Sequence, residues 1–308
     1  MAVNSIITNN GKKISMYRTF TVNSSLSATL YTAPTQFKVG ASQADVSVAD
    51  TDLTLPIPIS TGTVNADGDE VMTGSGGGDN STDNTTTYKP GANLTDNTSQ
   101  NLIANDTAVD KVWTIADLSA NGANCDATKY IGFWLYIKDA TALAKFKSTL
   151  TAVEIRIGAD STTNYYAQSW SRSDLAVGWN WLSDGALLST WVEEGTPGTL
   201  NDFQIRITTN NATDEFAAGD VLFDLLRQWE ASDTVKDYVS GYPSFDYTSR
   251  EVSVRCYLNL LEAEGFNIDG HGIFNEDTSA LLYSVSKFDA ESKSSTDEFA
   301  FVVKDIWI

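Results

Sequence analysis

The stretch Glu251-Val-Ser-Val-Arg-Cys-Tyr-Leu-Asn-Leu260 alternates apolar and polar side chains. Alternation over this length predicts a β-strand with one buried face. The cluster Asp269-Gly-His-Gly272 and the nearby Gly265 are expected to interrupt the train of strands that follows. Further strands are predicted at Ile273-Phe274, Leu281–Val285 and Glu298–Val303. The end of the sequence is therefore predicted to be antiparallel β-structure, and it needs partners to cover its apolar face.

The beginning of the sequence has the same character. Ile14–Thr21 and Pro34–Gly40 are strand candidates, and Thr51–Pro58 carries two prolines that confine it to an edge or an extended arm. We therefore predict one small, discontinuous antiparallel β-domain made of residues 1–60 and 240–308.

The middle of the sequence differs from both ends. Residues 61–84 are rich in Gly, Asn and Asp, and their composition predicts a flexible linker. Residues 85–230 contain short strand candidates at a spacing that predicts an inserted β-sandwich or jelly roll. A helix is expected at Asp139–Phe146 and a short one at Ser232–Val239. The strand candidates are Phe133–Lys138, Val153–Gly158, Tyr165–Trp170, Phe203–Thr208 and Val221–Leu226. The predicted fold class is all-β.

Composition narrows the classes of function. The chain has 308 residues, with 20 Lys plus Arg against 40 Asp plus Glu, so its formal net charge is −20. This charge repels phosphate backbones and argues against a nucleic-acid partner. No run of 18 apolar residues predicts membrane insertion, and the first residues lack the order of a signal peptide. Cys125 and Cys256 are expected to be free, buried thiols.

The two ends contain Ile7-Thr-Asn-Asn-Gly11, Pro34-Thr-Gln-Phe-Lys-Val-Gly40 and Asn267-Ile-Asp-Gly-His-Gly-Ile-Phe-Asn275. Together these segments resemble the virion-attachment domain of bacteriophage tail-collar fibre proteins. The resemblance covers about 120 residues in two pieces. It implies a domain that anchors a protein to a phage particle, and it implies homo-oligomers, with a trimer as the expected state.

The middle contains Asp83-Asn-Thr-Thr-Thr-Tyr-Lys-Pro-Gly91, Gly132–Ile137 and Gly178-Trp-Asn-Trp181. These segments resemble carbohydrate-binding jelly rolls. The resemblance implies a structural calcium ion between the opening segment and the last strand, held by Asp79 and Asp224. Alternation, however, points Asp224 to solvent. The separate run Asn65-Ala-Asp-Gly-Asp-Glu70 has oxygen donors at alternate positions but lacks a full calcium-loop pattern, so a solvated turn is the simpler interpretation.

Aromatic residues are dense in the inserted part. Tyr165, Tyr166, Trp170, Trp179, Trp181 and Trp191 fall within 27 residues. Sugars stack on such rings because the C–H-rich faces of pyranoses are apolar. The competing interpretations are that the rings fill the sandwich core or contact a partner protein. We take Tyr166, Trp170 and Trp191 as the glycan-binding candidates, with Tyr166 and Trp191 expected to be the most exposed.

Sequence motifs give no support for catalysis. The single histidine, His271, lies between glycines and is expected to be a turn residue. We find no nucleophile elbow, zinc-protease motif or phosphate-binding loop. Glu154, Glu193 and Glu194 are expected to be surface charges, and Arg156 and Arg206 to lie on a polar sheet face.

These inferences together predict a non-enzymatic structural protein of a tailed bacteriophage virion. It would be a tail-fibre, collar, baseplate or head-decoration component, made in the host cytoplasm and released by lysis. Its partners would be other virion proteins, further copies of itself, and a cell-surface polysaccharide bound by the jelly roll. The alternative is a stand-alone lectin or a glycan-active enzyme with a jelly-roll domain.

Overall fold

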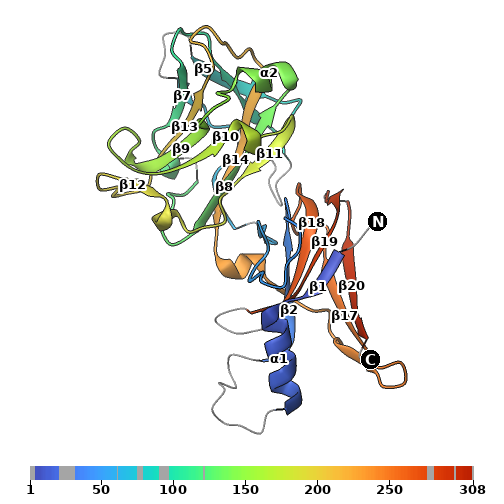
Figure 1. Ribbon diagram of the computed structural model, residues 1–308. Helices are drawn as coiled ribbons and strands as arrows, with labels where there is room; N and C mark the ends of the chain where they lie inside the picture. The colour runs from blue at the N-terminus through green and yellow to red at the C-terminus, as the bar shows by residue number, and fades with distance from the viewer. Residues whose placement is uncertain are drawn as a thin grey trace. The chain divides into compact units, whose positions relative to one another are not determined.

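The computed structural model describes residues 4–20, 32–60, 62–74, 79–89, 97–120, 122–275, 281–294 and 296–306. The chain divides into two compact units. The terminal unit consists of Met1–Thr61 and Ala231–Ile308, and the inserted unit of Gly62–Glu230. Antiparallel strands dominate both units (Figure 1), which confirms the predicted all-β class.

The terminal unit contains two antiparallel sheets. Their strand orders are β1-β19-β18-β2-β15 and β16-β17-β20. The elements of this unit are β1 (Asn4–Ile7), α1 (Asn9–Phe20), β2 (Pro34–Gly40), η4 (Ala231–Thr234), β15 (Lys236–Asp237), β16 (Ser244–Asp246), β17 (Glu251–Leu258), β18 (Asn267–Asn275), β19 (Leu282–Ser292) and β20 (Phe299–Ile306). In each sheet, some neighbouring strands are far apart in the sequence, and others are joined by short connections.

One part of the core of the terminal unit lies between these two sheets, and another part, formed by Leu53, Phe274, Leu282 and Val285, lies on the opposite face of the larger sheet. Phe37 lies opposite Ile273 and Val39 opposite His271, so all four side chains share one face of the larger sheet. The His271 ring stacks on Phe301 of β20 at a centroid distance of 4.8 Å. Val254, Cys256 and Leu258 are buried, which confirms the predicted apolar face of Glu251–Leu258.

The prediction of a strand at Ile14–Thr21 was wrong, because residues 9–20 form α1. The hydroxyl of Thr8 accepts a hydrogen bond from the N–H of Gly11 at 3.0 Å, as an N-terminal cap does. A Cβ at Gly11 would lie 2.0 Å from the carbonyl oxygen of Tyr283, so the first turn packs directly on β19. Capping and close packing outweigh the apolar alternation in this segment.

The prediction that the Asp269-Gly-His-Gly272 cluster interrupts the strands was wrong, because the cluster lies inside β18. A register shift between Ile268 and Gly270 accommodates it. A Cβ at Gly272 would lie 2.7 Å from the Phe274 ring, and one at Gly270 would lie 2.9 Å from the side-chain oxygen of Gln43. The glycines therefore permit close packing rather than a turn, and His271 is a strand residue and not a turn residue.

The inserted unit is a two-sheet β-sandwich. The sheet orders are β12-β10-β9-β13-β7-β4 and β11-β8-β14-β6-β5, with β3 paired to β14. The elements are β3 (Thr63–Ala66), β4 (Thr73–Gly74), β5 (Asn80–Asn84), β6 (Ser99–Ile103), β7 (Asp110–Ile115), η1 (Leu118–Ala120), β8 (Tyr130–Ile137), α2 (Ala140–Lys145), β9 (Thr151–Asp160), β10 (Asn164–Ser171), η2 (Arg172–Asp174), β11 (Gly178–Leu182), η3 (Leu188–Thr190), β12 (Val192–Glu194), β13 (Asp202–Thr208) and β14 (Val221–Trp229).

One apolar core joins the two sheets of the sandwich. Phe133 of β8, Phe203 of β13 and Phe223 of β14 are fully buried and in ring contact. The predicted helix at Asp139–Phe146 is present as α2, whose N-cap Asp139 accepts a hydrogen bond from the N–H of Ala142. The second predicted helix, Ser232–Val239, is instead the short η4 followed by β15.

The prediction that residues 61–84 form a flexible linker was wrong where the structure describes them. Residues 63–66, 73–74 and 80–84 are strands of the sandwich, while residues 75–78 lie outside the described part. Polar groups order the segment: the Ser81 hydroxyl accepts from the N–H of Met72 at 2.7 Å and donates to its carbonyl at 3.0 Å. The composition argument failed because sheet hydrogen bonds, together with burial of Ala66 and Met72 in the sandwich core, hold this segment.

Both cysteines are free and buried, as predicted. Burial raises the pKa of the Cys256 thiol, and burial with the nearby Asp126 charge raises that of Cys125. The outer face of the β9–β13 sheet also matches the prediction. Arg156 pairs with Glu154 at 2.7 Å, and Arg206 with Asp110 at 3.2 Å.

Candidate functional site

An acidic loop follows β3 in the inserted unit. The carboxylates of Asp67, Asp69 and Glu70 each place an oxygen within 4.8 Å of the other two. Glu70 Oε2 accepts hydrogen bonds from the N–H groups of Asp67 at 3.0 Å and Gly68 at 3.1 Å, which closes the loop on itself. Gly68 has a φ of +110°, and a Cβ there would lie 2.7 Å from Asp224 Oδ1. The loop is therefore tight, and it packs against the last strand of the sandwich.

The loop concentrates negative charge in a partly buried place. Burial raises the pKa of Glu70 to about 7, with the charges of Asp67 and Asp69 acting in the same direction. The pKa of Asp69 is also raised, first by its hydrogen bond with Asp67, then by burial and by the charges of Asp67 and Asp83. Within the described residues, buried Oδ1 of Asp67 has no hydrogen-bond partner. Protonation or a bound cation would relieve this repulsion.

Asp224, expected to face solvent, is 1% exposed. Its Oδ2 accepts a hydrogen bond from the N–H of Lys89 at 2.6 Å. The next residue, Leu225, has a φ of +51°, and the pairing of β14 with β8 shifts between Asp224 and Arg227. The prediction failed because it assumed a regular strand with an open outer face, whereas Asp224 is enclosed by the loops at Gly68 and Lys89.

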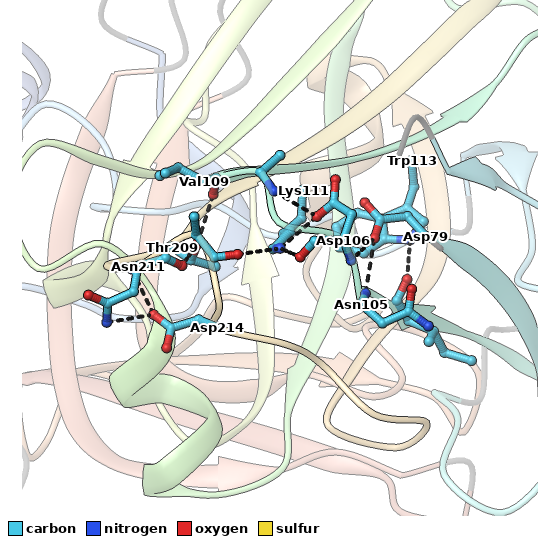
Figure 2. A network of polar contacts seen from close by, with 12 residues as sticks. Asp79, Asn105, Asp106, Val109, Lys111, Trp113, Thr209, Asn211 and Asp214 are labelled. Atoms are coloured by element: carbon cyan, nitrogen blue, oxygen red, sulfur yellow. Dashed lines mark hydrogen bonds and ion pairs between the residues drawn. The ribbon is translucent and has the colours of Figure 1, made fainter. Parts of the chain in front are cut away.

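Asp79 belongs to a different network (Figure 2). Its Oδ1 accepts from the N–H groups of Asn105 at 3.1 Å and Asp106 at 3.4 Å. Beside it, the fully buried Lys111 ammonium donates to Asp106 Oδ1 at 2.6 Å and to the Asp106 carbonyl at 2.8 Å. Burial raises the pKa of Asp79. The contacts are those of a residue that fastens the 105–106 turn to the start of β5.

The predicted calcium pair Asp79 and Asp224 is not brought together. Asp79 precedes Asn80, which lies opposite Ile103, whereas Asp224 follows Phe223, which lies opposite Gln100. These positions are separated by about five residues of β6, or about 16 Å. The sequence pattern missed this because strand register depends on contacts that it does not encode locally.

The acidic loop fits the calcium ion that the resemblance implies. Its donors are all oxygens, and a spread of up to 4.8 Å between them matches ligands about 2.4 Å from one central ion. Gln100 ties the loop to the sheet, since its Nε2 donates to the Gly68 carbonyl at 3.1 Å and to Asp83 Oδ1 at 2.7 Å. Asp67, Asp69 and Glu70 would hold such an ion, beside Asp224.

The three predicted glycan-binding rings turn toward the core. Tyr166 lies opposite Ile157 and Trp170 opposite Val153, so their side chains share the face of core residues. Both are half-buried, and Trp170 meets Phe133 edge-on at 6.0 Å. Trp191 is 6% exposed and belongs to the core. The expected exposure of Trp191 was therefore wrong, and the core interpretation applies to all three rings.

A second set of rings covers the opposite, outer face of the β11-β8-β14 sheet. Tyr136 and Trp179 lie opposite each other at 5.2 Å, and Trp134 and Trp181 at 5.1 Å. The contacts continue from Trp181 to Trp229 at 5.6 Å and from Trp229 to Tyr130 at 6.1 Å. We call these rings the aromatic layer: Tyr130, Trp134, Tyr136, Trp179, Trp181 and Trp229.

Two cations lie over this aromatic layer. Lys89 Nζ is 4.1 Å from the Trp134 ring centre, and the Arg227 guanidinium is 5.0 Å from that of Trp181. Burial lowers the pKa of Lys89 to about 8, against the opposing effect of the Asp224 charge. Trp134 and Trp229 are buried, while Tyr136 and Trp179 at one end of the layer remain half-exposed.

A row of side chains extends from the exposed end of the aromatic layer across the sheet. Tyr136 lies opposite Leu222, Leu222 opposite Asn101, and Asn101 opposite Thr82. The row thus passes from rings through an aliphatic side chain to an amide and a hydroxyl. Sequence reasoning missed the layer, although Tyr130–Ile137 is apolar on both alternating faces, a pattern of strands covered on both sides.

Comparison with models of known protein families finds no match, and comparison with curated proteins finds none either. No helix among the described residues is long and apolar enough to cross a membrane.

Proposed function

We propose that this chain is a non-enzymatic structural protein of a tailed bacteriophage virion, attached through the terminal unit. The observation that supports this most is the pairing of β2 with β18. These two strands carry the phage resemblance, and more than 200 residues separate them in the sequence. They are nevertheless neighbours in one sheet, with Phe37 opposite Ile273 and Val39 opposite His271. Such pairing is what a single attachment domain built from both ends requires.

The inserted sandwich supplies the binding surface in this proposal. Its half-exposed Tyr136 and Trp179 give an apolar platform, and the exposed Thr82 at the far end of the same row gives a hydroxyl group. Asn101 in that row is 5% exposed, and its amide donates to Thr82 and Asp83 and accepts from the N–H of Gly219, so it orders the platform rather than contacting the ligand. A saccharide presents an apolar C–H face and a polar rim, so it matches a row of this kind. We take a host-surface glycan as the ligand, with a jelly-roll-like sandwich as its reader.

Weak binding at each site would suffice on a particle. Many copies act together through their effective concentration, so single sites with millimolar affinity can give firm attachment. The acidic loop would hold calcium as a structural ion, keeping the 67–70 segment in place beside Asp224.

Particle association tests the first part of the proposal. Particles from the source of this chain would be purified by sedimentation and analysed by mass spectrometry, and we expect the chain at a fixed stoichiometry to the capsid protein. Absence from intact particles would reject the virion role and favour the alternative, a stand-alone lectin or glycan-active enzyme.

A glycan array with the recombinant chain tests the second part. Trp179→Ala and Tyr136→Ala should each reduce binding by about tenfold, as loss of a stacking ring does. Tyr247→Ala is the matched control, because this tyrosine is 89% exposed and lies in the terminal unit. Binding that survives in both sandwich variants would place the glycan site elsewhere, and hydrolysis of a bound glycan would favour the enzyme alternative.

A further inference from the structure

The last strand of the terminal unit has a free edge. β20 pairs with β17 along its whole length, from Phe299 opposite Leu258 to Ile306 opposite Glu251. It is the outermost strand of the β16-β17-β20 sheet, and its other edge pairs with no strand among the described residues. Eight residues present about 26 Å of unpaired backbone donors and acceptors. The sequence Phe-Ala-Phe-Val-Val at 299–303 carries no proline or charge that would block pairing there.

A cavity of about 700 Å³ lies along this edge. One side is formed by Phe299–Lys304 of β20, and the other includes Ser5 of β1, at the edge of the larger sheet. Figure 1 shows β1 and β20 next to each other within this unit. The lining is completed by His271, Ser286, Phe288, Glu291 and Glu298. Among the described residues the larger sheet has five strands and the smaller has three. The cavity lies beside β20, where no described strand of the smaller sheet covers β1.

The cavity has the character of an incomplete core. Its lining includes the rings of Phe288 and Phe301, which contact each other at 5.7 Å. His271 is 2% exposed, and its Nε2 has no hydrogen-bond partner among the described residues. On the other face of β20, Val302 is 57% exposed. An added strand beside β20 would cover apolar groups on both faces of the sheet.

We propose that the occupant of this edge is β20 of a second copy of this chain, paired antiparallel about a two-fold axis at Phe301. In this register Lys304 lies opposite Glu298 of the other copy, Val303 opposite Phe299, and Val302 opposite Ala300. Charges of opposite sign thus meet at both ends and apolar side chains meet between them. The pairing is self-complementary, as a two-fold interface requires.

The register also keeps side chains of like character on the same face of the paired strands. Phe299, Phe301 and Val303 face the cavity side of β20, because they lie opposite the buried Leu258, Cys256 and Val254. Ala300 and Val302 would cover each other on the outer face. In the single chain Lys304 already pairs with Glu251 at 2.9 Å, so the dimer would place this ammonium between two carboxylates.

This inference does not depend on the phage assignment or on glycan binding. It differs from the trimer implied by the resemblance, because a three-fold axis cannot pair a strand antiparallel with its own copy. The two predictions are therefore distinguishable by the mass of the complex in solution.

Charge reversal tests the register. The mass of the full-length chain would be measured by sedimentation equilibrium over a range of concentrations, and the wild type should be a dimer. Glu298→Lys places two ammonium groups opposite each other, and Lys304→Glu two carboxylates, so each should raise the dimer Kd by about tenfold or more. The double variant E298K/K304E restores opposite charges and should recover a Kd within about threefold of wild type.

Two controls keep the test decisive. Lys13→Glu reverses an exposed charge on α1 and should leave the dimer unchanged. Thermal melting of each variant shows whether the terminal unit still folds. A wild type that is monomeric at all concentrations overturns the proposal. So does a trimer, a dimer insensitive to both single reversals, or a double variant that fails to recover although it melts like the wild type.

Discussion

At the scale of single residues, His271 shows how burial can be read as a pH dependence. The ring lies between Phe37, at 5.9 Å, and Phe301, at 4.8 Å, and burial lowers its pKa from 6.5 to about 4. The folded terminal unit therefore holds the imidazole neutral. Unfolding releases it to water, where it binds a proton below about pH 6.5.

The consequence is a loss of stability in acid. The unfolded state binds more protons than the folded state between pH 6.5 and about 4, so the contribution of His271 is complete above pH 6.5 and declines as pH falls toward 4. Between about pH 7.5 and about pH 4.5 we expect the unfolding free energy of the terminal unit to fall by about 2.5 kcal/mol from this group. Urea titration followed by circular dichroism measures the change.

The variant His271→Phe separates this effect from the titration of carboxylates. Phe keeps a ring beside Phe301 and removes the titrating group, so the difference in pH slope between variant and wild type belongs to His271. Equal slopes in the two proteins would show that the imidazole is protonated or hydrated in the folded state.

At the scale of elements, the loop between β3 and β4 stores electrostatic repulsion. Burial, with the charges of Asp67 and Asp69, raises the pKa of Glu70 from 4.5 to about 7. Glu70 makes stability depend on pH in the opposite direction to His271. The folded state holds its proton more tightly, so the stability is complete below pH 4.5 and is lost as pH rises through about 7.

Glu70→Gln should therefore stabilise the inserted unit at about pH 8 in the presence of a chelator, by about 1–2 kcal/mol. The amide keeps an oxygen for the N–H groups of Asp67 and Gly68 and removes one charge. Millimolar calcium should raise the melting temperature of the wild type more than that of the variant. Equal calcium responses in wild type and variant would show that Glu70 is not a ligand, and no response in the wild type would remove the cation from this loop.

The elements also show what the sequence could predict. Strict alternation correctly predicted β9, β13 and β17, because in each strand only one face meets a core. It misled at Ile14–Thr21, where the cap at Thr8 and packing on β19 favour a helix. Adjacent polar loops also misled for Trp191, which was expected to be exposed and is 6% exposed. In sequence Tyr166 and Trp170 of β10 look like Trp134 and Tyr136 of β8, and only the register of the strands turns the first pair inward and the second pair outward.

At the scale of the whole molecule, each unit holds together the two points at which the chain enters and leaves it. In the inserted unit Thr63 pairs with Gln228, so the two ends of the sandwich lie on adjacent strands. In the terminal unit the N–H groups of Ile59 and Ser60 both reach the carbonyl oxygen of Asp233, at 2.7 and 3.3 Å. The ends of each unit are thus held together by hydrogen bonds within that unit, as in tolerated domain insertions.

We therefore expect both units to fold without each other. Residues 62–230 expressed alone should melt within about 3 °C of the matching transition in the full chain, because their core and both ends are self-contained.

The terminal unit should fold when a short Gly-Ser linker replaces residues 62–230, since Ile59 and Asp233 already fix the gap that the linker must span. Calorimetry of the full chain should then show two transitions that reproduce those of the separate pieces. The expectation is contradicted if the full chain melts in a single cooperative transition. It is also contradicted if the linked terminal unit is unfolded while the isolated sandwich folds normally. Either result would mean that the terminal unit needs the inserted unit in order to fold, rather than carrying it as an independently folding insertion.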